Sequence, residues 1–352
     1  MQANQRPKIL YFALLLSLSA FVLACFLRPA PYHAGINQYD RARFVDMVDG
    51  TASQPFVHRM LVPSIIRIVT QATPESLQQT CADQVEAHAR LKALFTFLNW
   101  ETLAAYPYWV ASILMLLCFM GFGHYIVKLT EHVLNLPAAG SPRLLLLTGA
   151  MLGLPALFKY VSYLYDPAQL FLFTLALYLL ATQRIQKFCV IFLVCCLNKE
   201  TAILLIPVYA LTSHTRSSSP RPYWRTLAAI TAIYLCVKLF LSWLFRANPG
   251  FIFELHPLHN LDRLTAGWSF PALGVFLGTV WLIRFRWQEK PAFLRVALPC
   301  ILLPLVALAL FMGFIEEWRG YYEAYPIVFA LLVDSLRRLN SSGCGSLPES
   351  AA

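Results

Sequence analysis

Two opposite charges, Lys199 and Glu200, interrupt an otherwise apolar stretch of the chain. Ionisable side chains within membrane segments are expensive to bury and generally serve a function. The ammonium group of Lys199 can pair with a lipid-linked phosphate, and Glu200 can orient or neutralise that ammonium group. The alternative is a structural ion pair that caps two short helices. We therefore take Lys199 and Glu200 as the first candidate catalytic residues.

A second set of candidates follows the first apolar segment of the chain. Tyr39 and Asp40 lie just beyond that segment, where the Asp40 carboxylate can deprotonate an acceptor hydroxyl. The alternative for Asp40 is a solvated loop acid. Further along, His58 and Arg59 can bind a phosphate, because a guanidinium group grips phosphate in a two-pronged fork. The alternative for Arg59 is an interfacial arginine that extends its charged head into water.

The third set precedes the final apolar segment and contains Glu317, Arg319 and Tyr322. Arg319 can clamp a phosphate leaving group, and the aromatic side chains of this loop can stack on a sugar. The commoner use of such aromatic residues is a belt at the membrane interface. Lys159 and Asp166, which flank a tyrosine-rich turn, are further candidates of the same type.

The composition restricts what kind of protein can carry these residues. Of the 352 residues, 58% are hydrophobic and 13% are charged, and the mean hydropathy is +0.58. Soluble domains are about 45–50% apolar and about 25% charged. These values exclude a soluble enzyme, a disordered chain, a fibrous protein and a secreted disulfide scaffold. The apolar residues form continuous runs of the kind that cross a bilayer as helices, rather than the alternating pattern of a barrel.

The apolar runs predict an all-α, polytopic transmembrane bundle. We expect about 9–10 membrane helices, including a short hairpin, within a single membrane domain at residues 1–340, followed by a flexible cytoplasmic tail at 341–352. The predicted spans are residues 9–27, 103–128, 144–164, 168–182, 224–245, 271–283, 296–314 and 324–336, with the hairpin at 188–212.

The positions of the basic residues predict how this bundle is oriented, because arginine and lysine accumulate in cytoplasmic loops. Arg184 and Lys187 precede the segment 188–212, and Arg221 and Arg225 follow it. Both pairs are cytoplasmic only if that segment enters the membrane and returns. We therefore predict a helical hairpin whose tip, Asn198-Lys199-Glu200, points outward.

The acidic residues sort in the opposite way. Only Glu131, Glu289, Asp334 and Glu349 fall in predicted cytoplasmic parts. The function is therefore expected at the extracytoplasmic face. The net charge of +10 indicates membrane orientation rather than a nucleic-acid partner.

The predicted outer loop at residues 28–102 contains a juxtamembrane helix. Residues 57–71 place Leu61, Ile65 and Ile68 on one helical face, which is typical of a helix lying along the membrane surface.

Together, these features resemble the GT-C superfamily of integral-membrane glycosyltransferases, and most closely its small uncharacterised bacterial members. The resemblance rests on Tyr39-Asp40 in the first outer loop, the juxtamembrane helix, the hairpin with Lys199-Glu200, and Glu317-x-Arg319-x-x-Tyr322 before a final span. It implies an extracytoplasmic site in a bacterial inner membrane. It also implies a polyprenyl-phosphate sugar donor and a glycan or protein acceptor. Asp40 best matches the family's acidic residue, which serves as a base or a metal ligand, although no acid adjoins it here.

On this hypothesis, Asp40, Lys199, Glu200 and Arg319 are catalytic and surround one outward cavity. Tyr39, His58, Arg59, Glu317 and Tyr322 bind substrate. The residue spacing indicates no cofactor and no metal site, although the family leaves a divalent metal open. Two other functions stay open: a polymerase or transporter of lipid-linked glycans, whose charges would line a path through the membrane, and a non-catalytic envelope protein.

Overall fold

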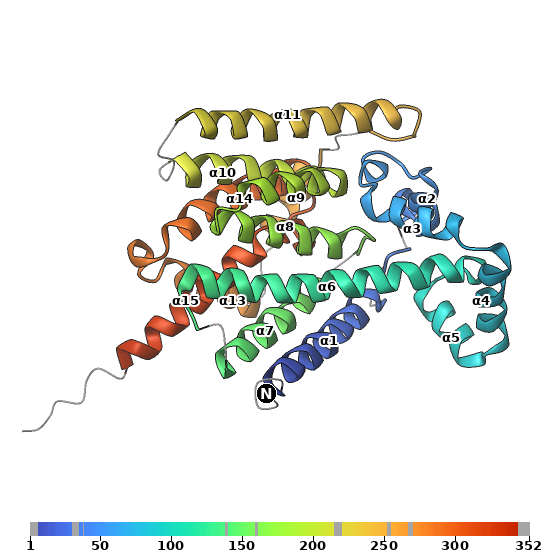
Figure 1. Cartoon of the computed structure of the whole chain (residues 1–352), viewed down its shortest axis with the longest axis horizontal. Coiled ribbons are helices and arrows are strands. Elements are labelled where there is room, and N and C mark those ends of the chain that lie inside the picture. The colour runs from blue at the N-terminus through green and yellow to red at the C-terminus, as the bar shows by residue number, and fades with distance from the viewer. Residues whose placement is uncertain are drawn as a thin grey trace, which may run out of the picture.

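The chain is folded into helices, without a β-strand, over the residues that the structure describes (Figure 1). The structure is a computed structural model. It describes residues 6–29, 35–37, 39–137, 140–158, 161–214, 220–251, 255–266 and 270–343. The predicted all-α class is therefore confirmed for this part of the chain.

The described residues form the following α-helices, in chain order. They are α1 (Arg6–Leu27), α2 (Phe44–Asp49), α3 (Leu61–Ala72), α4 (Glu75–Ala87), α5 (Ala89–Leu98), α6 (Ala105–Leu134), α7 (Ser141–Gly153), α8 (Asp166–Ala181), α9 (Ile185–Asn198), α10 (Leu205–His214), α11 (Pro220–Leu244), α12 (Pro257–Thr265), α13 (Phe270–Arg284), α14 (Ala292–Phe311) and α15 (Tyr325–Gly343).

Four of these helical segments are long and apolar enough to cross a membrane. They cover Lys8–Leu27, Thr102–Leu134, Pro220–Leu244 and Ala292–Phe311. The other predicted spans correspond to shorter apolar helices, among them α7, α8 and α9, and to α15. Length and composition thus support four of the predicted membrane helices directly.

Residues 188–212 fold as the two helical segments of the predicted hairpin, and the placement of the hairpin in a membrane stays a prediction. Helix α9 ends at Asn198, the backbone of Lys199 is extended (φ −157°, ψ 145°), and the chain continues through a 3₁₀ helix, η6 (Glu200–Leu204), into α10. Phe188 near the start of α9 stacks on Tyr209 of α10, with ring centroids 6.2 Å apart. This contact requires α10 to return alongside α9.

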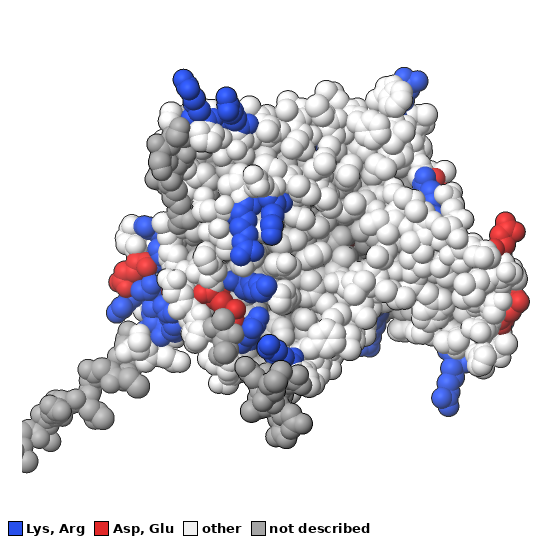
Figure 2. Space-filling model, viewed as in Figure 1, with Lys and Arg blue, Asp and Glu red and all other residues white. Residues whose placement is uncertain are grey.

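One end of the bundle, which we call the basic end, collects the C-termini of α6, α8 and α15. Arg337 donates to the Leu134 carbonyl across 3.0 Å, and the His132 ring lies 3.3 Å from the Ala181 carbonyl. Much of the lysine and arginine visible in Figure 2 gathers over the left of the molecule, where these termini lie. The N-termini of α8 and α15 lie at the opposite end.

The opposite end, which we call the loop end, carries the chain between α1 and α6. Asn37 ties this loop to α6: its Nδ2 donates to the Tyr108 hydroxyl at 3.0 Å, and its Oδ1 accepts from the Phe44 amide at 3.1 Å. Gln54 donates to the Phe245 carbonyl at 3.0 Å, which ties the same loop to the end of α11. The predicted surface helix begins at Leu61, four residues later than expected, because residues 56–58 form a 3₁₀ turn.

The local sequence explains where helix α8 begins and where helix α6 ends. Helix α8 begins with Asp166-Pro167, an acid and a proline in the first turn, where the helix dipole favours negative charge and proline costs no hydrogen bond. Helix α6 ends at Leu134 and is followed by Asn135, whose left-handed backbone (φ 51°) is a common helix stop.

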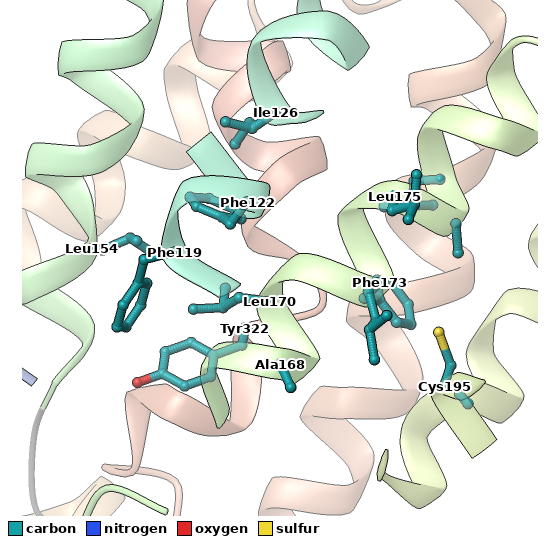
Figure 3. Close-up of a cluster of buried hydrophobic side chains, with 14 of the residues drawn as sticks. Phe119, Phe122, Ile126, Leu154, Ala168, Leu170, Phe173, Leu175, Cys195 and Tyr322 are labelled. Atoms are coloured by element: carbon teal, nitrogen blue, oxygen red, sulfur yellow. The ribbon is translucent and has the colours of Figure 1, made fainter. Parts of the chain in front are cut away.

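An apolar core separates the two ends. Figure 3 shows Phe119 and Phe122 of α6 beside Leu170 of α8, and Phe173 of α8 on the side toward Cys195 of α9. Helix α8 is almost wholly enclosed, and beyond Gln169 the described buried side chains that it contributes are apolar except for Thr174.

Candidate functional site

A polar cluster at the loop end unites residues from four distant segments. The segments are the turn after η3 (Phe56–His58), the start of α8, the hairpin tip and the chain from 317 to 323 that leads into α15. Ends of several helices meet here, so their polar groups need partners other than helical backbone. We define the polar cluster as Arg59, Tyr165, Asp166, Gln169, Asn198, Lys199, Glu200, Thr201, Glu317, Arg319, Tyr322 and Glu323.

Lys199 pairs with Glu323 rather than with its neighbour Glu200. One oxygen of Glu323, Oε1, accepts from Lys199 Nζ at 3.0 Å, from the Thr201 hydroxyl at 2.5 Å and from Gln169 Nε2 at 3.1 Å. The two charged side chains are 7% and 0% exposed. The alternative of a Lys199–Glu200 pair is therefore wrong, because the extended backbone at Lys199 sends successive side chains to opposite sides.

Glu200 instead binds Arg59 of the first loop. Both carboxylate oxygens are engaged, at 2.5 Å from Nη2 and 3.2 Å from Nε, and Nη1 donates to the Tyr165 hydroxyl. The guanidinium carbon also lies 4.6 Å from the Tyr165 ring centre. The phosphate-gripping fork that the sequence predicts for Arg59 is thus filled by Glu200.

Arg319 is held less completely. Its Nη2 donates to Glu317 at 2.7 Å, and its guanidinium lies 4.2 Å from the ring centre of Tyr163. Its Nε is buried and has no hydrogen-bond partner. Burial by itself lowers the pKa of Arg319, but the influence of Tyr163, Glu317 and Asp166 outweighs burial and raises that pKa above its ordinary value. The guanidinium group of Arg319 therefore stays charged, and its Nε donor is unpaired.

Asp166 is the most enclosed carboxylate of the cluster. It is 0% exposed, its Oδ2 accepts from the Tyr163 amide at 3.0 Å, and its Oδ1 has no hydrogen-bond partner. Arg319, Lys199 and Arg59 are the cations whose charges act on it. Asp166 thus joins the cluster, whereas Lys159, the other candidate from the same turn, lies outside the described residues.

Tyr322, a predicted substrate-binding residue, is buried in the cluster. Its ring lies edge-on to Phe158, with centroids 6.4 Å apart, and its hydroxyl has no hydrogen-bond partner. Its side chain is only 1% exposed, so its hydroxyl faces the interior rather than the surface.

Asp40 lies outside the polar cluster. Its side chain is 85% exposed and pairs with Arg43 at 2.7 Å. It lines an open cleft of about 510 Å³, together with Asn37, Arg43, Asn99, Trp100 and Glu101. The sequence predicts one cavity shared by Asp40, Lys199 and Arg319. The structure separates them, because Lys199 and Arg319 are turned toward buried partners while Asp40 faces solvent.

A stack of aromatic rings connects the Asp40 cleft to the cluster. Tyr39, adjacent to Asp40, lies edge-on to Tyr163 with ring centroids 6.1 Å apart. Tyr163 in turn stacks on Tyr165 at 5.3 Å and lies under Arg319. The cleft and Arg319, whose Nε has no hydrogen-bond partner, are therefore joined through two tyrosines.

His58 is buried beside the cluster and is not placed to hold a phosphate as a cation. Its ring lies 6.1 Å from that of Phe245, and its Nε2 has no hydrogen-bond partner. Burial lowers the pKa of His58 below its ordinary value; Lys238 and Arg59 lower it further, and Glu200 opposes them. A histidine in these surroundings is neutral at pH 7.

Glu323, Gln169 and Tyr163 belong to the site but were not among the residues that the sequence singled out as its members. Glu323 directly precedes the last apolar helix, which is the same kind of signal that marks Lys199. In the part of the chain that the structure describes, no group of three histidine, cysteine, aspartate or glutamate residues is arranged to hold a metal ion.

No family model, no curated protein and no solved structure matches this chain. Its function is therefore argued from the geometry of the site.

The Lys199–Glu323 pair generates a first prediction. Replacing either partner alone, as Lys199→Met or Glu323→Gln, should lower the free energy of unfolding by about 3–5 kcal/mol, because the other group loses its charged partner in a buried site. The double variant should recover a large part of that loss. Chemical denaturation of the four proteins in detergent measures both effects. Additive losses would contradict a direct interaction.

His58 generates a second prediction, on the pH dependence of stability. Because its pKa in the folded protein lies below the unfolded value of about 6.5, its contribution is present above that pH and is lost as the pH falls toward the folded pKa. The thermal midpoint should therefore decrease from pH 7.5 to pH 5 by less in His58→Gln than in the wild type. His88→Gln, a change at an exposed histidine, serves as the control. Equal decreases in wild type and His58→Gln would exclude His58 as the source.

Proposed function

We propose that the protein is an integral-membrane glycosyltransferase of a bacterial inner membrane. It would transfer a sugar from a polyprenyl-phosphate donor to a glycan or protein acceptor at the extracytoplasmic face. Four helical segments have the length and hydropathy of membrane spans. The basic end then lies in the cytoplasm by the positive-inside rule, and the loop end lies outside. This orientation gives both the cleft and the polar cluster access to the outer leaflet.

The observation that carries this proposal is the connection between Asp40 and Arg319. Asp40 lines an open polar cleft, Tyr39 beside it contacts Tyr163, and Arg319 covers Tyr163 with its Nε unpaired. A carboxylate for the acceptor and a cation for the phosphate are thus linked through Tyr39, which is partly buried, and Tyr163, which is buried. A base and a cation for the leaving phosphate are two groups that a sugar transfer from a lipid phosphate requires.

The reaction follows from these placements. The acceptor hydroxyl binds in the cleft, and Asp40 takes its proton as the oxygen attacks the anomeric carbon of the sugar. The bond from that carbon to the phosphate oxygen breaks on the opposite face. The lipid phosphate leaves with the electron pair, and Arg319 stabilises its charge. This is an inverting transfer in a single displacement.

Lys199, Glu200 and Arg59 have a different role from the one that the sequence suggests. Their charges are matched by Glu323 and by each other, so they hold the hairpin tip against α15 and the first loop. They act as positioning residues that fix Tyr165 and, through it, the stacked Tyr163.

The core between the two ends favours a transferase over a transporter of lipid-linked glycans. A transporter needs polar groups along its path through the membrane. Here, buried side chains of α6 and α8 between the ends, such as Phe122, Ile126 and Phe173, are apolar (Figure 3).

Asp40→Asn tests the proposed base. This variant should lose about 10²–10⁴-fold in product formation, the usual contribution of a general base. Asp49→Asn, the same change at an exposed aspartate nine residues away, should stay near wild type. Purified proteins in lipid nanodiscs are incubated with a panel of polyprenyl-phosphate hexoses and with glycan and peptide acceptors, and products are identified by mass spectrometry. Full activity of Asp40→Asn would reject the base, and no product from the wild type across the panel would reject the transferase.

A further inference from the structure

The three ion pairs of the polar cluster differ in how easily their carboxylates can leave. Glu323 is fully buried and accepts from three donors on one oxygen. Glu200 binds Arg59 with both oxygens. Glu317 makes a single contact with Arg319, through Oε2, and its side chain is 19% exposed. Glu200, at 38%, is more exposed than Glu317, but its release breaks two contacts with Arg59. Release of Glu317 breaks one contact and returns a partly exposed carboxylate to water, so it costs least of the three.

The position of Glu317 in the chain also favours movement. It directly precedes the short 3₁₀ helix η8 (Trp318–Tyr321), outside any α-helix, with φ −80° and ψ 88°. Glu323, in contrast, is followed within two residues by α15. A side-chain rotation at Glu317 therefore disturbs no α-helix, and the ion pair that it breaks is the one with Arg319.

The contact that Glu317 makes is an incomplete version of a phosphate contact. Nε and Nη2 form one edge of the guanidinium group, and a phosphate takes both donors at once. Arg59 shows this two-pronged arrangement with Glu200, through Nε and Nη2. On Arg319, Glu317 takes Nη2 and leaves the buried Nε without a partner. A phosphate in place of Glu317 therefore gains a hydrogen bond that the carboxylate does not make.

Electrostatics require that Glu317 leave before an anion binds. The charges of Glu317 and Asp166 both act on Arg319, and Asp166 is fully enclosed and cannot move to water. With Glu317 in place, a phosphate would meet two carboxylates around one guanidinium group. With Glu317 turned outward, one negative charge is exchanged for another, and the local balance is kept.

We propose that Glu317 is a gating carboxylate. It occupies Arg319 in the absence of ligand and swings out when the phosphate of a polyprenyl-phosphate lipid takes the Nε–Nη2 edge. Glu317 thereby sets the affinity of the site for phosphate-bearing lipids. The inference rests on the proposed function only in taking Arg319 as the phosphate site, and it requires no transfer reaction.

Glu317→Gln tests the gate, because glutamine keeps the size of the side chain and removes its charge. Glu316→Gln is the matched control: the adjacent glutamate pairs with His259 at 2.8 Å and with Arg263 at 3.3 Å, away from Arg319. Arg319→Met removes the binding group. Isothermal titration of each protein in nanodiscs uses two probes, farnesyl phosphate as a short polyprenyl phosphate and inorganic phosphate. Thermal midpoints are compared to verify folding.

We expect Glu317→Gln to bind farnesyl phosphate about tenfold more tightly than the wild type, as it would if the open state is about one tenth populated. Glu316→Gln should match the wild type, and Arg319→Met should lose binding. An equal gain for inorganic phosphate would show that the phosphate group alone is recognised. A gain confined to farnesyl phosphate would show that the lipid chain is also needed. Both results support the gate.

Unchanged or weaker binding of farnesyl phosphate by Glu317→Gln would overturn the gate, as would an equal gain in Glu316→Gln. This outcome is distinct from failure of the proposed function. A tenfold gain in binding together with no sugar transfer in the mass-spectrometric assay would keep the gate and reject the transferase. Sugar transfer by the wild type, together with no gain in farnesyl phosphate binding by Glu317→Gln, would reject the gate and keep the transferase.

Discussion

The buried ion pair between Lys199 and Glu323 is the contact on which the rest of the site depends. It joins residues 124 positions apart in the chain and fixes the hairpin tip against the start of α15. Because the backbone at Lys199 is extended, Glu200 must then face the other way, where it meets Arg59. One buried charge pair therefore decides where the first loop docks, and through Arg59 it positions Tyr165 and the aromatic stack.

Local charge balance is the second constraint. A charge removed from water is tolerated only with a partner, so each of Arg59, Lys199 and Arg319 carries its own carboxylate. The three ion pairs differ in how strongly they are held. The two that are buried or doubly bonded hold the structure together, and the single-contact pair of Arg319 and Glu317 leaves a donor for a ligand. A network that stabilises the fold can in this way contain one position that is able to bind.

The aromatic stack joins Asp40 and Arg319, whose surroundings differ. The Asp40 side chain is 85% exposed, whereas that of Arg319, at 13%, lies in a drier place where its charge acts more strongly. Tyr39 and Tyr163 cover the distance between these two environments.

The helical class and the four long apolar segments can be predicted from the sequence, because each depends on residues that are neighbours in the chain. The sequence also predicts the hairpin, because basic residues on both sides of 188–212 leave only one way to arrange that segment. For Lys199, the sequence leaves open a phosphate contact or an ion pair with the adjacent Glu200, and the structure pairs Lys199 with Glu323. The spacing of Lys199 and Glu200 suggests a mutual pair, and only the extended backbone between them shows that they face apart.

What the sequence by itself determined is which side chains are too costly to bury without a partner: Arg59, Lys199, Glu200 and Arg319 stand out from the chain alone. What only the tertiary structure decided is which partner each one has. Glu323 pairs with Lys199 and Asp40 lies apart from Arg319 because helix packing, rather than spacing along the chain, brings distant carboxylates to these cations or keeps them away. The burial cost is a property of the residue, and the compensation for it is a property of the fold.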